Sequence, residues 1–165
     1  MKKVWLEIKD YVIIVLVVVI IRTFIVTPAI VDGASMDKTL EDGQLVLINK
    51  FTYRFNDIDR FDIVVVSNKE DNDKIIKRVI GLPNETITYK DNHLFINGEL
   101  ITSDYDFDGT GDFTKTTSDN EYFVMGDNRK VSKDSRVLGN FTKKEILGKV
   151  NVRLFPFSKF GKIEK

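Results

Sequence analysis

An apolar run near the N-terminus is the feature that most constrains how this chain can fold. Residues Tyr11 to Ile21 read YVIIVLVVVII, and beyond Arg22 and Thr23 the apolar character continues to Val31. A helix needs about 20 residues to cross the hydrocarbon layer of a membrane. Because an arginine can extend its charged end to the interface, Arg22 need not interrupt such a span. The run therefore predicts a transmembrane helix.

The charges around the run set the expected topology. Three lysines, Lys2, Lys3 and Lys9, precede it, and this bias favours a cytoplasmic N-terminus. We expect a cytoplasmic segment at residues 1–10, a transmembrane anchor at 11–30 and an extracytoplasmic domain at 31–165, in a single-pass protein of the cell membrane. Two other interpretations stay open. The run could be a signal peptide cleaved after Thr27-Pro28-Ala29, or a helix buried in a core.

The composition excludes several kinds of chemistry. The 165-residue chain has no cysteine, so disulfides, thiolate catalysis and cysteine-ligated zinc are ruled out. It has one histidine, His93, expected at the surface, which leaves little material for a Ser-His-Asp site. The 25 basic residues balance 25 acidic ones, and this gives no reason to expect nucleic acid as a partner. The chain does contain the serines and lysines that a serine nucleophile activated by a lysine would need.

After Val31 the pattern changes to short segments rich in β-branched residues. Closely spaced segments of this kind are typical of an antiparallel β domain. They cover Gln44 to Ile48, Phe61 to Val66, Lys74 to Ile80, Thr86 to Tyr89, Leu94 to Asn97, Glu121 to Met125 and Gly148 to Phe155. Asp91-Asn92 and Asn97-Gly98 are turn signals. We therefore expect a mostly β fold, with an exposed loop at residues 102–120 and one short helical candidate at Lys143 to Leu147.

Ser35 and Lys77 form the most informative pair of residues. Ser35 follows Gly33-Ala34, where the backbone can turn tightly. Strand alternation places Lys77 and Arg78 on opposite faces, so that one of them shares a face with buried neighbours. Burial lowers the pKa of a lysine, and a neutral amine can take the proton of a serine. The alternative is a plain turn serine and an edge-strand lysine that opposes aggregation.

Two further segments carry candidate chemistry. Gly126 to Arg136 reads GDNRKVSKDSR, which can place a hydroxyl and an Asp-Arg pair around the lysine, although an ordinary polar loop has the same composition. Asp104 to Lys115 reads DYDFDGTGDFTK and imitates a calcium loop, but its twelfth position is a lysine in place of the bidentate glutamate. We therefore expect no metal site.

Together these segments resemble the type I signal peptidases, in particular the Gram-positive kind with a single anchor. The family's segment from the anchor into the nucleophile is similar to RTFIVTPAIVDGASMDKTLEDGQLVLINK. The three boxes that follow it are similar to DRFDIVVV, KRVIGLP and GDNRKVSKDSR, and the C-terminal strand is similar to KVNVRLFPFSKFG. Four motifs in order at suitable spacing make a specific match that covers most of the chain.

The resemblance implies a role for each candidate. Ser35 would be the nucleophile and Lys77 the general base, with the backbone N–H of Ser35 on one side of the oxyanion hole. Gly33 stands where some members carry a donor hydroxyl, which leaves the Gly33 main chain or water for that task. The remaining residues would be Ser132, which orients the lysine, the structural pair Asp134 and Arg136, and the pocket residues Val31, Met36, Leu40 and Ile76.

The resemblance also implies an activity. It is that of a membrane-anchored serine endopeptidase that cleaves signal peptides from exported preproteins after small residues of the Ala-x-Ala type, through an acyl-enzyme. The implied partners are secretory preproteins and the lipid bilayer. The implied chemistry uses no cofactor, no metal and no nucleic acid.

Three features depart from the family pattern. Lys38 stands where the family has proline, Asn84-Glu85 replaces a Gly-Asp pair, and the loop at 102–120 is short. Lys38 could loosen the turn after Ser35 and slow the enzyme, so a weakly active or inactive relative is one alternative. Such a protein would serve as an assembly factor or chaperone for surface proteins such as pili. A self-cleaving repressor is a second alternative, but it would need a DNA-binding head in place of the apolar run.

Overall fold

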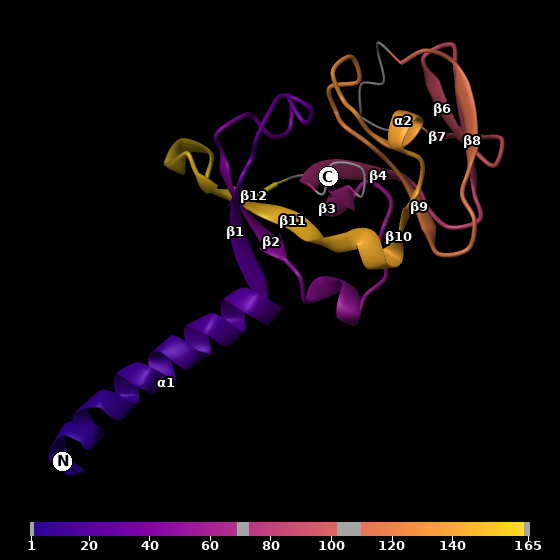
Figure 1. The fold of residues 1–165 in the computed structure, drawn as a ribbon. Helices are drawn as coiled ribbons and strands as arrows, with labels where there is room; N and C mark the ends of the chain where they lie inside the picture. Colours follow the sequence, from indigo (N-terminus) through magenta and orange to yellow (C-terminus); the bar gives the residue numbers. More distant parts are fainter. Residues whose placement is uncertain (1, 69–72, 102–109, 164–165) are drawn as a thin grey trace.

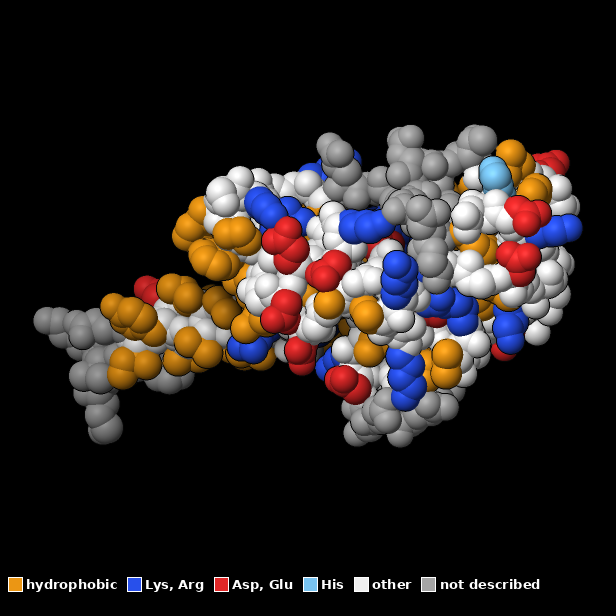
Figure 2. All heavy atoms as spheres, turned by 90° about the horizontal axis from the view of Figure 1, so that it is seen from above, with side chains coloured by type: hydrophobic (Ala, Val, Ile, Leu, Met, Phe, Trp, Pro, Cys, Tyr) orange, Lys and Arg blue, Asp and Glu red, His pale blue; other side chains and the backbone are white. Residues whose placement is uncertain are grey.

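The computed structural model describes residues 2–68, 73–101 and 110–163, with side chains from residue 8 onward. Helix α1 (Lys2–Phe24) projects from a β-rich body as a separate rod (Figure 1). Its described apolar side chains are exposed and cover its surface in Figure 2, so the interpretation as a helix buried in a core is wrong. In the described ranges, no helix combines the length and the apolar character that a membrane span requires. The anchor therefore stays a prediction.

The chain changes from helix to strand earlier than the sequence predicts. α1 begins at Lys2, inside the segment expected at 1–10, and it ends at Phe24 rather than near residue 30. Strand β1 (Val26–Ile30) follows and pairs antiparallel with β2 (Leu45–Asn49). Pro28 fits there because β1 is the outer strand of its sheet. A cleavage after Ala29 would remove most of a paired strand, which argues against a cleaved signal peptide.

The larger sheet forms the centre of the body. Its strand order is β1-β2-β11-β3-β4-β9-β10 with antiparallel pairs throughout, and β12 pairs with β11. The further strands are β3 (Ile63–Asn68), β4 (Asp73–Gly81), β9 (Glu121–Met125), β10 (Phe141–Thr142), β11 (Ile146–Phe155) and β12 (Gly161–Lys162). β9 pairs with β4 only between Arg78 and Gly81, so the opposite part of that edge, Asp73 to Lys77, has no strand beside it in the described residues. The prediction of a mostly antiparallel β domain is confirmed.

A smaller sheet lies at the far end of the body from α1 (Figure 1). Its order is β7-β6-β5-β8, with β5 (Thr86–Lys90), β6 (His93–Ile96), β7 (Glu99–Ile101) and β8 (Phe113–Thr116). The predicted turns at Asp91-Asn92 and Asn97-Gly98 are confirmed, and all four residues take the positive φ that two-residue hairpin turns require.

The range 102–120, expected as an exposed loop, is mostly exposed where the structure describes it, but the loop prediction is wrong at Phe113–Thr116, which form a strand. β8 lies inside that range and pairs with β5, and Thr110 and Thr117 on either side of it are buried. Residues 102–109, which include much of the calcium-like segment 104–115, lie outside the described residues. A short polar strand such as β8 has no hydrophobic alternation, so only its pairing with β5 identifies it.

Apolar side chains are buried on both faces of the larger sheet. Val64 and Val65 are consecutive in β3 and belong to different clusters, one of which contains Val31, Met36 and Leu40. A third cluster, around Phe123, packs the smaller sheet against β9. The short helices are η1 (Thr52–Arg54), α2 (Ser135–Leu138), η2 (Lys143–Glu145) and η3 (Phe157–Lys159). The helical candidate at Lys143 to Leu147 is thus a single 3₁₀ turn that leads into β11.

Candidate active site

Ser35 lies in a tight turn directly after β1. The chain leaves the sheet at Val31, and Gly33 takes a φ of +82°, a left-handed conformation that favours glycine. On the far side, the Leu40 N–H donates to the Met36 carbonyl at 2.8 Å and closes the turn. The turn presents Ser35 half-buried at the surface of the body.

Lys77 reaches this turn from strand β4. Its Nζ lies 2.7 Å from Ser35 Oγ, a hydrogen-bond distance, and only 3% of the lysine is exposed. Burial lowers the pKa of Lys77 from 10.5 to about 8. The carboxylates of Asp134 and Asp127 oppose this shift, and the positive charge of Arg136 assists it. A large fraction of the amine is therefore neutral in mildly alkaline solution, where it can accept the serine proton.

Arg78, the neighbour of Lys77, is also fully buried. Its Nε and Nη2 donate to the two carboxylate oxygens of Asp127 at 2.9 and 2.7 Å. Asp127 also accepts a hydrogen bond from the Thr39 hydroxyl at 2.6 Å, and Thr39 belongs to the turn that carries Ser35. The sequence predicted that one of the two cations would be buried. Both are buried, because the serine turn covers both side chains, through Ser35 at Lys77 and through Thr39 at Arg78, and Asp127 of the loop after β9 also pairs with Arg78.

The loop after β9 closes the site. The buried Asp134 caps α2 and binds Arg136 through Nε at 2.8 Å and Nη2 at 2.9 Å. It also accepts from the Gly126 N–H at 3.0 Å. Burial alone would raise the pKa of Asp134, but the hydrogen bonds and charge of Arg136, together with the Ser132 hydroxyl and the Gly126 N–H, outweigh it and hold the pKa below its usual value. The Asn128 N–H donates to the Ser35 carbonyl at 3.0 Å, so this loop rests on the serine itself.

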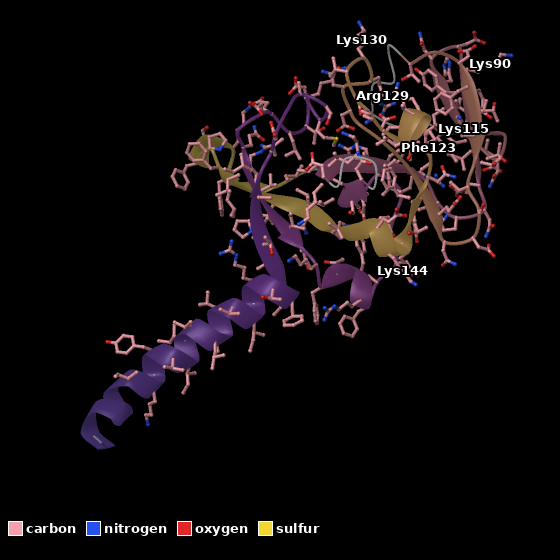
Figure 3. The ribbon with its side chains drawn as sticks, in the orientation of Figure 1. Lys90, Lys115, Phe123, Arg129, Lys130 and Lys144 are labelled. Atoms are coloured by element: carbon pink, nitrogen blue, oxygen red, sulfur yellow. The ribbon has the colours of Figure 1, made fainter. Side chains whose placement is uncertain are left out.

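Ser132, expected to orient the lysine, lies near the Ser35 carbonyl and, within the described residues, makes no hydrogen bond to Lys77. Its hydroxyl is buried without a partner of good geometry. A Cβ on Gly126 would collide with the Ser132 side chain and with the Ser35 carbonyl oxygen, so both groups pack closely against that glycine. The Gly126 carbonyl is in turn held by Arg129 Nε at 2.8 Å, and Figure 3 shows Arg129 beside α2.

The Ser35 backbone N–H is a candidate donor for an oxyanion. In the described part of the chain, the Ser35 N–H makes no hydrogen bond. The Gly33 N–H, considered from the sequence as a second donor, is already engaged, because it donates to Asp42 Oδ1 at 2.8 Å. Any second donor therefore comes from another group or from water.

A cleft of about 260 Å³ opens beside Ser35 and Lys77. It runs between residues 30–32 and the unpaired edge of β4, as far as Asp73. Among the predicted pocket residues, Val31, Met36 and Ile76 line it. Leu40 does not, and its prediction as a lining residue is wrong. The turn that follows Met36 directs Leu40 into the apolar cluster below, where it is fully buried.

Two departures from the family pattern have a structural account. Lys38 takes a φ of +87°, whereas a proline there would fix φ near −65°. Asn84 takes a φ of +61°, a conformation that asparagine tolerates almost as glycine does. Glu85 binds both nitrogens at the end of Arg60, at 2.6 and 2.9 Å. The turn after Ser35 therefore has a shape at Lys38 that a proline could not adopt. The turn at Asn84-Glu85 has a shape that a glycine could also adopt.

The remaining candidates lie away from the dyad. His93 stands exposed at the start of β6, with Nδ1 2.6 Å from the Asp91 carbonyl oxygen. Among the residues that the structure describes, no three metal-ligating side chains form a cluster. The site itself brings together a serine, a lysine and two carboxylate–arginine pairs.

Comparison with known proteins identifies the family. A family model described as signal peptidase, peptidase S26, matches residues 5–155. The chain belongs to the signal peptidase family. Its resemblance to the type I members is confirmed, since relatives that match most of the chain are named signal peptidase I.

Several members of the signal peptidase family match almost the whole chain. Signal peptidase I P of Bacillus subtilis subsp. natto is 40% identical over 168 residues, which cover 93% of this chain and 90% of the relative. Signal peptidase I S of Bacillus subtilis (strain 168) is 41% identical with the same coverage. Signal peptidase IB of Staphylococcus aureus (strain N315) is 36% identical over 162 residues, 86% of this chain and 84% of the relative.

A solved signal peptidase supports the same fold. The crystal structure of a signal peptidase I from Enterococcus faecalis V583 matches with a TM-score of 0.53 and 34% identity. The match covers 57% of this chain and 97% of that one. Family membership supports signal peptidase activity, and therefore a serine peptidase, for this chain.

Sequence reasoning missed the residues that brace this signal peptidase site from behind. Arg78, Asp127 and Thr39 were not among the candidates, although they link β4, the serine turn and the loop after β9. A signal was available. An arginine in an apolar strand requires a buried acidic partner, and Asp127 follows directly after the apolar strand β9.

Proposed function

We propose that this chain is a membrane-anchored serine endopeptidase that removes signal peptides from exported preproteins, cleaving after small residues. The observation that carries the proposal is the 2.7 Å hydrogen bond between Lys77 Nζ and Ser35 Oγ in a nearly dry environment. Membership of the signal peptidase family supports the class of reaction. The Ser35–Lys77 pair supports a mechanism for that reaction, in which the lysine activates the serine.

The reaction proceeds by acyl transfer. Neutral Lys77 takes the proton from Ser35 Oγ as that oxygen attacks the scissile carbonyl carbon. The resulting ammonium then gives its proton to the leaving amide nitrogen, and the C–N bond breaks to leave an ester on Ser35. A water attacks this ester, Lys77 takes the water's proton, and the proton returns to Ser35 Oγ as the acid leaves. Lys77 thus serves as base and acid in turn.

The negative charge on the carbonyl oxygen needs donors that are already in place. The Ser35 N–H is one, since it has no other partner in the described residues. A donor of this kind typically contributes about 3 kcal/mol to transition-state stabilisation. The Asn128 N–H holds the Ser35 carbonyl, which belongs to the next peptide group, and so restrains the backbone directly after this donor.

The cleft fits an extended peptide with small side chains. The edge of β4 from Asp73 to Lys77 offers backbone groups that a peptide strand can pair with. Val31, Met36 and Ile76 form apolar walls in a cavity of about 260 Å³, so alanine-sized side chains fit and large ones are excluded. Leu40 supports these walls from the core.

Helix α1 serves as the anchor. Its apolar side chains from Ile8 to Phe24 are exposed around the helix, an arrangement that is costly in water and favourable in lipid. The anchor holds the catalytic domain on the extracytoplasmic side, beside the membrane that holds the preprotein. Ser132 and the Asp134–Arg136 pair position the dyad, and the chemistry uses no metal or cofactor.

A weakly active relative that assists the assembly of surface proteins is the second candidate. Lys38 is the observation that favours it, since its left-handed conformation reshapes the turn directly after Ser35. Such a protein would keep the fold and the cleft but cleave slowly.

Peptide cleavage tests the proposal. The full chain in detergent micelles is assayed on a peptide with an Ala-x-Ala site, beside Ser35→Ala and Lys77→Ala. We expect cleavage after the second alanine by the wild type and none by either variant, with circular dichroism showing that both variants stay folded. Normal cleavage by Ser35→Ala would refute the dyad, and slow cleavage by the wild type would favour the assembly factor.

A further inference from the structure

Asp42 is a charged residue of the serine turn that the mechanism above does not use. Its Oδ1 accepts a hydrogen bond from the Gly33 N–H at 2.8 Å. Gly33 stands two residues before Ser35, just beyond the end of β1. The side chain of Asp42 therefore restrains the backbone on the N-terminal side of the nucleophile.

This contact extends the pairing between β1 and β2 by one step. Beyond the last residue of β1, the Val31 N–H donates to the Gln44 carbonyl at 2.8 Å, and the Val31 carbonyl accepts from the Gly43 N–H at 2.9 Å. Two residues after Val31, the Gly33 N–H points to the same side, as the alternation of a strand requires. It meets the carboxylate of Asp42 where a longer β2 would offer a backbone carbonyl.

The same alternation turns the carbonyl of Asp32 away from β2. The Asp32 carbonyl and the Gly33 N–H belong to one trans peptide group, in which the two point in opposite directions. β1 is the outer strand at one end of its sheet, and residues 30–32 line the catalytic cleft. Within the described residues, no backbone N–H donates to the Asp32 carbonyl. It is therefore an acceptor that a ligand in the cleft can use.

The backbone at Gly33 would allow this peptide group to turn over. Gly33 takes a φ of +82°, and a glycine populates positive and negative φ about equally. Apart from its chain neighbours, no atom lies within 4 Å of the place where a Cβ on Gly33 would stand, so close packing does not hold it. A half-turn of the group would direct the carbonyl away from the cleft. The hydrogen bond to Asp42 is the contact that selects the observed orientation.

We propose that Asp42 is a positioning residue for the substrate main chain. It holds the peptide group between Asp32 and Gly33 so that the Asp32 carbonyl accepts a hydrogen bond from a substrate N–H on the N-terminal side of the scissile bond. The inference rests on the proposed function, which puts an extended peptide in the cleft. The unpaired edge of β4 borders the same cleft, so one peptide contacts both edges.

Binding measured apart from cleavage tests this role. The full chain with Ser35→Ala, called the parent protein below, is titrated in detergent micelles with a fluorescent Ala-x-Ala peptide, and the anisotropy gives Kd. We expect Asp42→Ala in the parent protein to raise Kd about fivefold, the effect of one lost hydrogen bond between neutral groups. Asp42→Asn keeps an oxygen that accepts from the Gly33 N–H, and it should leave Kd unchanged.

Glu41→Ala is the matched control. Glu41 is exposed in the same loop, but its carboxylate binds Lys159 and Gln44 and does not reach Gly33. It should leave Kd unchanged, and circular dichroism should show that every variant stays folded. An unchanged Kd in Asp42→Ala overturns the inference. An equal rise in Glu41→Ala also overturns it, because it would reveal a general loosening of the loop.

Peptides that lack one N–H identify the hydrogen bond itself. In a series of peptides, the backbone amides before the scissile bond are replaced one at a time by an ester, which has no N–H to donate. We expect one replacement to raise Kd about fivefold in the parent protein and to have no further effect in Asp42→Ala, since both changes remove the same hydrogen bond. A series without any effect in the parent protein overturns the inference without need of a variant at position 42. Equal effects in the two proteins at every position overturn it as well.

Cleavage of the unmodified peptide by the wild type separates this inference from the proposed function. If the peptide is cleaved and the ester series shows no dependence on Asp42, the inference fails and the proposed function stands. If that dependence is found but the wild type does not cleave the peptide, the proposed function fails and the role of Asp42 in peptide binding stands.

Discussion

Activity should follow the protonation of Lys77. Burial lowers the pKa of this amine from 10.5 to about 8, which corresponds to about 3 kcal/mol in favour of the neutral form. With that pKa, roughly a tenth of the amine is neutral at about pH 7 and roughly nine tenths at about pH 9. If the neutral amine is the base, kcat/KM rises about tenfold over this range, with a midpoint at the pKa of the free enzyme.

The assay is the pH dependence of kcat/KM for an Ala-x-Ala peptide, with the full chain in detergent micelles. Lys77→Arg should be inactive at every pH, because an arginine in this place never loses its proton. His93→Gln should keep the wild-type profile, because His93 contacts the Asp91 carbonyl in the smaller sheet and not the dyad. A flat profile, or an acid limb that disappears in His93→Gln, would refute the reasoning.

Two backbone positions give further predictions. Lys38→Gly should raise the free energy of unfolding by roughly 0.5–1 kcal/mol, because glycine takes a positive φ at little cost, whereas Lys38→Pro should lower it. Urea unfolding measures both, and a proline variant as stable as the wild type contradicts the left-handed turn. Gly126→Ala should lower the free energy of unfolding by about 1–3 kcal/mol and reduce kcat, because its Cβ collides with Ser132 and with the Ser35 carbonyl. Gly111→Ala adds the same atom in open space and should change neither quantity. Equal effects at the two glycines would contradict the close packing at Gly126.

Hydrophobic patterning predicted the strands that bury a face and missed those that depend on a partner. β3 and β4 carry continuous runs of β-branched residues and were placed within two residues of their observed bounds. The five residues of β1 were assigned to the anchor, because they continue an apolar run and show no alternation of apolar and polar side chains that would mark a strand. Its identity comes from pairing with β2, which lies fifteen residues further on and is invisible to a local pattern.

The dyad was predictable and its surroundings were not. A serine after a glycine and a lysine in an apolar strand are local signals, and the structure brings their side chains to 2.7 Å. The engaged N–H of Gly33 and the inward direction of Leu40 depend on contacts with Asp42 and with the core. Those contacts follow from the path of the loop, which the sequence does not encode in any single segment.

The adjacent cations on β4 explain why the dyad can be held so closely. Lys77 and Arg78 point to opposite faces of the strand, yet Lys77 binds Ser35 and Arg78 binds Thr39, which lies in the same turn. The turn therefore contacts the side chains on both faces of β4, and Asp127 pairs with the charge of Arg78. A buried ion pair contributes little net stability, since the cost of removing its charges from water offsets their attraction. Its value here is geometric, because it fixes the register between strand and turn on which the distance from amine to hydroxyl depends.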